Sequence, residues 1–365
     1  MVEADEVALA ERLIAFDSSQ PEGKLAAAEF VGGWLAANGV EHSVVELNGL
    51  PSLVATAGGG ARSVIWSSHL DVVPGDPRQF QPRLEQGRLY GRGAYDMKGA
   101  LAAMLGALGE LAADPVDELQ VKLLIVADEE SEAAALEAKA TARLADQGHV
   151  GEFAICGEPT DLQVGVQAKG ALVLTIEVEG RSAHGSTPWL GENAVLNAID
   201  LYRQIGELPF ARERSELFAG PSVNLGRIHG GDAVNRVPDR CTIDVDVRYL
   251  PGQDPGEVLR QVRTLGGSAQ IRYHIPAATV HPQQPHVQAL RDAVRAHRGG
   301  PAPGVGRNGA SDAAVFLARG VPSVEFGPVG GDHHGPEEHV EVESLRTYRR
   351  VLVDFTRALR GIGDT

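Results

Sequence analysis

Apolar side chains recur at helical spacing through the first forty residues. Residues three and four positions apart share one face of a helix, so this spacing is typical of amphipathic helices. The pair Asn38-Gly39 then interrupts the pattern and is a usual helix end. We therefore expect two helices before residue 40. Their apolar faces consist of Val7, Leu9, Leu13 and Ile14, and of Leu25, Phe30, Val31 and Leu35.

After residue 40 the pattern changes to short apolar runs bounded by Gly, Pro and Asp, separated by stretches rich in Ala and Leu. Short bounded runs are typical of buried strands, and the stretches between them of helices. Strands that alternate with helices predict an α/β domain with a mainly parallel sheet. The runs are Ser63–Trp66, Val121–Ala127, Phe153–Cys156 and Val324–Phe326, and the helical stretches include Gly99–Ala112 and Glu130–Leu144.

The pattern shifts again between about Lys169 and Ile275. Alternating apolar residues from Leu172 to Val178 predict a half-buried strand, and the segments that follow complete the order β-α-β-β-α-β. This order is that of the ferredoxin-like split unit. We expect an inserted α+β domain over 169–276, which divides an α/β domain made of 1–168 and 277–365.

Composition and charge are those of an ordinary globular chain. The 365 residues are 43% apolar and 22% charged, and the net charge is −16. Such a charge repels phosphate backbones, which argues against nucleic acid as a partner. No 18 apolar residues run together, and the first residues are not those of a signal peptide, so we expect a cytoplasmic protein without a membrane partner. The cysteines, Cys156 and Cys241, form no metal-binding or disulfide pattern.

Residues able to bind metal follow each of the four predicted strands. The carboxyl ends of parallel strands meet at one edge of a sheet, so these side chains should converge there. A fifth group, the Gly-rich segment Gly91–Gly99 with Asp96, lies just before a helix. The residues after the strands are His69 and Asp71, Asp128-Glu129-Glu130, Glu158, and His333 and His334.

Each of these residues also has a structural interpretation. A single histidine at a strand end is commonly a hydrogen-bonded core residue, the acidic run 128–130 suits the first turn of a helix, and Cys156 suits a packed strand. Five chain segments that point to one place favour a site. Several carboxylates buried together are best explained by cations that neutralise them. Nitrogen and oxygen ligands without thiolate suit a catalytic zinc ion.

At these residues the chain resembles the dizinc metallopeptidase and amidohydrolase superfamily of acetylornithine deacetylase, succinyl-diaminopimelate desuccinylase and carboxypeptidase G2. The motifs are SSHLDVVP, GRGAYDMKG, ADEE, GEPT, SAHGSTPWLGENA, NRVP, DVRY, GASDA and HGPEEHV, in this order. The resemblance implies two zinc ions, with cobalt or manganese as possible substitutes. It assigns as their ligands His69, Asp96, Glu130, Glu158 and His334. His333 does not fit the H-x-P-x-E spacing of the last motif, so His334 is favoured.

The same resemblance implies a role for each residue. Asp96 would bridge the ions, His69 and Glu158 would bind one ion, and Glu130 and His334 the other. Zinc lowers the pKa of bound water to about 7. Glu129, next to a ligand but not a ligand itself, is the expected general base and acid. Asp71 would accept the second imidazole N–H of His69.

The insertion is expected to act as a lid and a dimerisation domain. His184 resembles the histidine that stabilises the oxyanion, often donated by the partner subunit of a homodimer. Asn235 and Arg248 resemble residues that hold the substrate, and a guanidinium suits a carboxylate. Lys169 is a further candidate for binding the substrate. The alternatives are a strand-surface ion pair for Arg248 and a solvated side chain for Lys169.

The chain departs from its relatives at two places that bear on function. Relatives often have a Gly-rich turn after DEE, whereas here the chain is expected to enter a helix at once. Desuccinylases have a Thr within the segment aligned with Gly309–Asp312 and an Asn where Gly330 stands, and both would touch the acyl group. Gly309 is therefore a candidate substrate contact, and a succinyl group is in doubt.

We expect a dizinc hydrolase of an N-acyl amino acid with a free carboxylate. A carboxypeptidase or dipeptidase is the alternative within the same chemistry. A catalytically silent metal-binding module is the alternative of another class, and the retained Glu129 argues against it. An oxidoreductase is disfavoured because no G-x-G-x-x-G follows the first strand, and no G-x-S-x-G supports a serine hydrolase.

Overall fold

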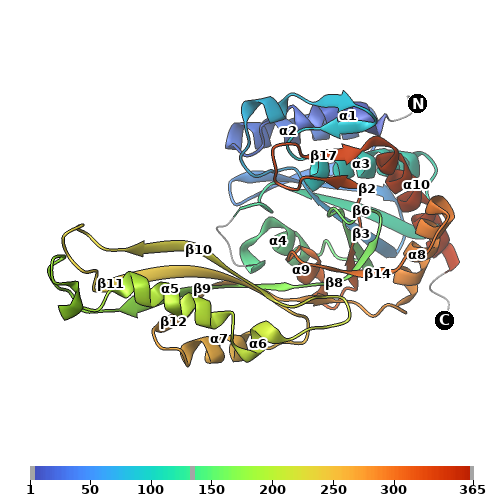
Figure 1. Ribbon diagram of the computed structural model, residues 1–365. Helices are drawn as coiled ribbons and strands as arrows, with labels where there is room; N and C mark the ends of the chain where they lie inside the picture. The colour runs from blue at the N-terminus through green and yellow to red at the C-terminus, as the bar shows by residue number, and fades with distance from the viewer. Residues whose placement is uncertain (1–4, 132–135, 362–365) are drawn as a thin grey trace. The chain divides into compact units, whose positions relative to one another are not determined.

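The computed structural model describes residues 5–131 and 136–361 (Figure 1). By its internal contacts the chain divides into two compact units. The first comprises Met1–Val166, Val280–Val305 and Ser311–Thr365, and the second comprises Gln167–Thr279 and Gly306–Ala310. The predicted insertion, 169–276, lies within the second unit. The structure adds Gly306–Ala310 to that unit, where the carbonyl of Arg307 accepts the N–H of Lys169 at 3.0 Å.

The largest sheet is mixed, and its parallel central strands belong to the first unit. Its order is β1-β2-β6-β3-β7-β15-β8-β13, with β14 paired to β8. The pairs β6–β3, β3–β7 and β7–β15 are parallel, and the hairpin β1–β2 and the pair β2–β6 are antiparallel. The strands are β1 (Glu41–Leu47), β2 (Leu50–Gly58), β3 (Arg62–His69), β6 (Leu119–Val126), β7 (Phe153–Cys156), β8 (Val164–Ala168), β13 (Ala278–Thr279), β14 (Gly304–Arg307) and β15 (Ser323–Glu325).

Helices cover both faces of this sheet, which is why its central strands are apolar along their whole length. Figure 1 shows α1, α2 and α3 on one side and α4 and α9 on the other, and α10 packs against α3 and α8. In β3, Val64, Ile65 and Trp66 are fully buried. The helices are α1 (Glu6–Ile14), α2 (Pro21–Ala37), α3 (Gly99–Ala113), α4 (Ala140–Asp146), α8 (Pro285–Arg298), α9 (Ala313–Leu317) and α10 (Val342–Ala358). The fold is the expected α/β class with a largely parallel central sheet.

Two expectations about helices are wrong in detail. Leu25, predicted on the buried face of the second helix, is 47% exposed, because α2 packs through the smaller face that holds Ala27, Ala28 and Val31. No α-helix begins at Glu130: α4 starts at Ala140, and 136–138 form a single 3-10 turn. Residues 132–135 of the expected helix lie outside the described residues.

The second unit folds as one antiparallel sheet with helices on one face. Its strand order is β10-β11-β9-β12, the order of a ferredoxin-like split unit. Figure 1 shows α5 and α7 on the same side of this sheet. The inward residues of β9 and β11, such as Leu174 and Val245, are fully buried beneath them. The elements are β9 (Gly170–Glu179), α5 (Ala194–Ile205), α6 (Pro209–Arg212), β10 (Ser222–Gly230), β11 (Arg240–Tyr249), α7 (Pro255–Arg263) and β12 (Ser268–Ile275).

A third, small sheet was not predicted, and it joins two distant parts of the first unit. Its order is β16-β17-β5-β4, with β17 antiparallel to β5. The strands are β4 (Arg83–Glu85), β5 (Arg88–Tyr90), β16 (Gly330–Gly331) and β17 (His339–Glu341). The pairing brings the loop before α3, which contains Asp96, next to the loop that contains His333 and His334.

Within 5–131 and 136–361, no helix has both the length and the apolar character needed to cross a membrane.

Candidate active site

Three parallel strands end at one edge of the first sheet, and each leads into predicted ligands. His69 is the last residue of β3, Asp128-Glu129-Glu130 come after β6, and Glu158 comes after β7. The side chain of His69 is almost fully buried. The strand geometry therefore gathers these residues where functional crevices of α/β sheets usually form.

The carboxylate of Asp96 is the centre of the cluster. One oxygen, Oδ1, lies 3.1 Å from Nε2 of His69. The other, Oδ2, lies 2.5 Å from Nε2 of His333 and 3.3 Å from Nε2 of His334. One buried carboxylate thus faces imidazoles on both of its sides.

Two carboxylates extend the cluster beyond Asp96. Oε1 of Glu158 lies 3.9 Å from Nε2 of His69, and Oε1 of Glu130 lies 3.0 Å from Nε2 of His334. All five predicted ligands are therefore brought together, with Asp96 between the other four. His333 also reaches Asp96, although the motif spacing favours His334; His334 has the further contact with Glu130.

Asp71 supports the cluster through two different groups. Nδ1 of His69 lies 3.0 Å from the backbone oxygen of Asp71 and 3.6 Å from its carboxylate. The carboxylate accepts the backbone N–H groups of Glu129 at 3.3 Å and Glu130 at 3.0 Å. Asp71 thereby connects the imidazole of His69 to the loop that carries the expected base.

The cluster strongly perturbs its own protonation. Burial lowers the pKa of His69, but the hydrogen bond to Asp96 and the surrounding carboxylates outweigh burial and hold that pKa well above its usual value. Burial raises the pKa of Glu158, and the charge of Asp96 raises it further. For Asp96, burial raises the pKa, but hydrogen bonds from the histidines bring it well below the usual range.

Two further groups in the cluster, His334 and Asp71, have raised pKa values. Hydrogen bonds to Asp96 and Glu130 raise the pKa of His334 to about 10. Burial raises the pKa of Asp71 to about 6, against the opposing charges of His69 and Lys24. The raised pKa values of His69 and His334 show that the cluster favours positive charge.

The donor atoms fit divalent metal ions. His69, Asp96 and Glu130 each offer a ligand atom within 4.8 Å of the others, and so do Asp96, His333 and His334. The donors are imidazole nitrogens and carboxylate oxygens, the set typical of catalytic zinc. The neighbouring Cys156 is a buried strand residue, and burial raises its pKa.

A buried ion pair that sequence reasoning missed holds the two ligand loops together. Oε2 of Glu338 lies 2.5 Å from Nη1 of Arg92, and its Oε1 accepts the N–H groups of Tyr95 and Asp96, both at 3.1 Å. Arg92 also donates to the carbonyl of His334 at 3.0 Å. Both residues lie inside the motifs that carry the resemblance, and this position was the available signal.

Tyr95 and the backbone of His339 leave no room for a side chain at Gly330. A Cβ atom added to Gly330 would lie 2.3 Å from Cδ2 of Tyr95 and 2.3 Å from the carbonyl oxygen of His339. The Tyr95 hydroxyl donates to Asp161 at 2.8 Å, which fixes the ring. The aromatic side chain thus occupies the space that an Asn at 330 would need.

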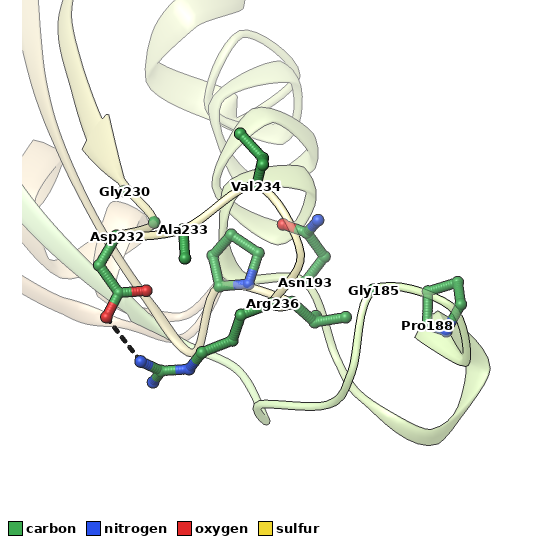
Figure 2. Close-up of a pocket in the computed structure, with 11 residues that line it drawn as sticks. Gly185, Pro188, Asn193, Gly230, Asp232, Ala233, Val234 and Arg236 are labelled. Atoms are coloured by element: carbon green, nitrogen blue, oxygen red, sulfur yellow. Dashed lines mark hydrogen bonds and ion pairs between the residues drawn. The ribbon is translucent and has the colours of Figure 1, made fainter.

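In the second unit, the loops of His184 and Asn235 lie side by side. The N–H of Gly185 donates to the carbonyl of Asn235 at 2.7 Å, and Nε of Arg236 donates to Ser182 at 2.7 Å. Figure 2 shows the pocket beside these loops, with the ion pair of Arg236 and Asp232 on one side. Nδ1 of His184 lies 2.8 Å from the Ser186 hydroxyl, on the surface of the unit.

The remaining predicted substrate residues lie at the other end of β9. Arg248 is opposite Ala171, two residues after Lys169. Nε of Arg248 lies 3.0 Å from the carboxylate of Asp246, so the surface ion pair considered as its alternative role is present. The ammonium of Lys169 lies 5.6 Å from the Phe218 ring centroid, and Gly309 lies in the segment Gly306–Ala310.

Comparison with known proteins gives a consistent result. The sequence profile of peptidase family M20/M25/M40 matches residues 65–358. A succinyl-diaminopimelate desuccinylase of Stenotrophomonas maltophilia is 29% identical over 340 residues, which cover 86% of this chain and 89% of the relative.

Solved structures of the same fold include a metallo-carboxypeptidase of the M20 family from Sulfolobus solfataricus and a tripeptidase from Staphylococcus aureus. The carboxypeptidase has a TM-score of 0.79 at 18% identity, covering 97% of this chain and 98% of its own. The tripeptidase has a TM-score of 0.78 at 21% identity, covering 98% of both chains. At these identities the likeness establishes the fold alone.

From the buried ion pair we predict that two adjacent glutamates, Glu338 and Glu337, contribute very differently to the free energy of unfolding. Glu338→Gln should lower the free energy of unfolding of the metal-free protein by about 3–5 kcal/mol, because the buried Arg92 loses its counter-charge. The control, Glu337→Gln, removes a solvent-exposed pair with Arg83 and should cost less than about 1 kcal/mol. Urea unfolding measures both, and equal small losses would contradict a bracing role for Glu338.

Proposed function

The chain belongs to peptidase family M20/M25/M40 and is a hydrolase of amide bonds, and on that premise we propose a dizinc enzyme that deacylates an N-acyl amino acid. The observation that carries this proposal is the carboxylate of Asp96, which faces His69 on one side and His333 and His334 on the other. A carboxylate in this position suits a bridge between two ions. Its outer partners would be His69 and Glu158 for one ion, and Glu130 and His334 for the other.

The proposed chemistry divides between the ions and the chain. Two zinc ions, when bound, would polarise the scissile carbonyl and make water more acidic. Glu129 would take a proton from the attacking water and deliver it to the leaving amine. Asp71 would hold the Glu129 loop through the backbone N–H groups of residues 129 and 130. His184, Asn235, Lys169 and Gly309 are proposed to contact the substrate. We propose a cytoplasmic enzyme of amino-acid biosynthesis.

We propose an N-acyl amino acid as the substrate because the relatives include desuccinylases. The proposed acyl group, however, is not the succinyl group of those relatives. By the resemblance, the segment Gly309–Asp312 lacks a Thr and position 330 lacks an Asn that would touch a succinyl group, and Tyr95 takes up space beside Gly330. An acyl group other than succinyl is therefore proposed. A carboxypeptidase or dipeptidase is the alternative, because solved structures of this fold include peptidases.

A substrate panel with a base variant tests the proposal. Zinc-loaded protein should hydrolyse an N-acyl amino acid faster than a dipeptide, and Glu129→Gln should lower kcat by about 10²–10⁴-fold. Both proteins should bind two ions per chain by elemental analysis. The control Glu137→Gln alters an exposed carboxylate of the same loop region and should keep full activity.

Each measurement has an outcome that would contradict this proposal. A variant Glu129→Gln that keeps more than about a tenth of the activity would require another base. One ion or none per chain, with every ligand intact, would exclude the two-ion site. Faster cleavage of dipeptides would favour the peptidase alternative.

We propose that Arg248 binds the free carboxylate of the substrate through the outer nitrogens of its guanidinium. Loss of this charge-assisted contact should cost about 1.5–3 kcal/mol, a roughly ten- to hundredfold loss in kcat/KM. Amidation of the substrate carboxylate should therefore impair the wild type strongly and Arg248→Ala only slightly. The control Arg272→Ala, on the same polar face and paired with Asp244, should keep the wild-type response. An equal penalty in Arg248→Ala would leave the ion pair with Asp246 as its only role.

We further propose a homodimer formed through the second unit. Most of its exposed large apolar side chains lie on η4 (Pro188–Leu190), at the start of α5, and on β10 with its following loop, whereas Ile271 lies on β12; β10 is an edge strand. Figure 2 shows Val234 and Pro188 around one pocket of this region. Exposed apolar patches and open edge strands commonly mark association surfaces. The side chains are Trp189, Leu190, Leu196, Ile228 and Val234.

The dimer predicts that two inactive variants complement each other. His184→Ala and Glu129→Gln chains should each be inactive, and mixing them should restore up to about a quarter of the wild-type activity. Recovery occurs because one site of each mixed dimer contains both intact groups if His184 acts across the interface. Subunit exchange is verified with a mass-tagged chain. Subunit exchange without recovery of activity would mean that His184 acts within its own chain or has no role in the reaction.

A further inference from the structure

Lys139 is a buried cation that contacts the expected base. It lies directly before α4, and its side chain is only 4% exposed. Its ammonium donates to the carbonyl of Glu129 at 2.7 Å and to Oε1 of the same residue at 3.2 Å. Lysine is almost never fully buried unless it is paired. Two contacts with one glutamate therefore account for its position.

The two residues that follow Lys139 hold the same region. The N–H of Ala140 donates to the carboxylate of Asp128, with distances of 3.0 and 3.2 Å to its two oxygens. The hydroxyl of Thr141 donates to Oδ2 of Asp312 at 2.5 Å. Three consecutive residues thus contact the acidic loop 128–130 and the buried Asp312. Residues 139–141 therefore hold the loop around the base.

Charge explains why a cation is needed at this point. Glu129 and Asp312 are both carboxylates near the buried end of the site, and like charges at short range are unfavourable. Burial raises the pKa of Asp312 above its usual value, the nearby charge of Lys139 opposes this rise, and the charge of Glu129 adds to it. The ammonium therefore offsets the repulsion between the two carboxylates while it holds one of them by a hydrogen bond.

We propose that Lys139 is a positioning residue for the reaction, which holds the carboxylate of Glu129 in the orientation needed for proton transfer. The inference rests on the proposed role of Glu129 as the base. A side chain with several rotatable bonds, such as glutamate, loses efficiency when its orientation is not fixed. Small misplacements of reacting groups can reduce rates by about a hundredfold. The ammonium of Lys139 contacts two oxygens of Glu129, the backbone carbonyl and Oε1. Loss of the ammonium therefore frees both the carboxylate and the loop carbonyl.

A double-mutant cycle tests this role on the full-length, zinc-loaded protein. Lys139→Met should lower kcat by about 10- to 100-fold, with KM changed less than about threefold and metal content unchanged. In the Glu129→Gln background, Lys139→Met should cost less than about a further twofold, because a residue that acts through Glu129 has nothing left to position. The control Lys122→Met alters a lysine of β6 outside the cluster and should keep activity within about twofold.

The outcomes separate this inference from the proposed function. A wild type without amide-bond hydrolysis in the substrate panel overturns both. An active wild type with an equally active Lys139→Met, or losses that multiply in the double variant, overturns the positioning role alone. A loss of zinc that accounts for the whole loss of activity also overturns it. If Lys139→Met does not fold, the same cycle is run with Lys139→Arg. The displaced guanidinium should lower kcat less than Lys139→Met would, and this loss of kcat should again disappear in the Glu129→Gln background.

Discussion

The organisation of the first unit depends on a buried carboxylate, Asp96, which needs positive charge beside it. A carboxylate removed from water is costly unless it is paired or bound to a metal ion. Imidazoles approach both of its oxygens, and Glu130 and Glu158 flank those imidazoles in turn. The excess of carboxylates over cations is therefore the defining property of the site, because divalent ions can balance it more completely than protons on histidine.

Such a cluster repels itself, so the surrounding structure has to hold it together. Glu338 binds the backbone at Asp96 and pairs with Arg92, which in turn binds the carbonyl of His334. The small sheet β16-β17-β5-β4 also brings these two loops together through backbone pairing. On the other side, Asp71 holds the Glu129 loop. Backbone pairing thus sets the positions of the ligand loops, and buried charges then set the orientation of the ligands.

The sequence was sufficient to predict the parts that depend on strand order. His69, Glu130 and Glu158 could be placed together because parallel strands present their carboxyl ends at one edge. The small sheet could not be predicted, because its strands are two or three residues long and carry little periodicity. The contacts of Glu338 and Lys139 were also missed, since each pairs with a residue through tertiary structure. The helix expected from Glu130 failed because tertiary hydrogen bonds to Asp128 oppose local helix propensity.

The residues proposed to take part in the reaction divide between the two units. The five predicted ligands and Glu129 belong to the first unit, whereas His184, Asn235, Arg248 and Gly309 belong to the second. The second unit has its own apolar core beneath α5 and α7, so its loops can change without disturbing the charge balance around Asp96. In the first unit, by contrast, the ligands and their supporting residues contact one another directly. In the proposed function, the substrate contacts of the second unit can therefore change, while the residues around Asp96 are held in place by one another.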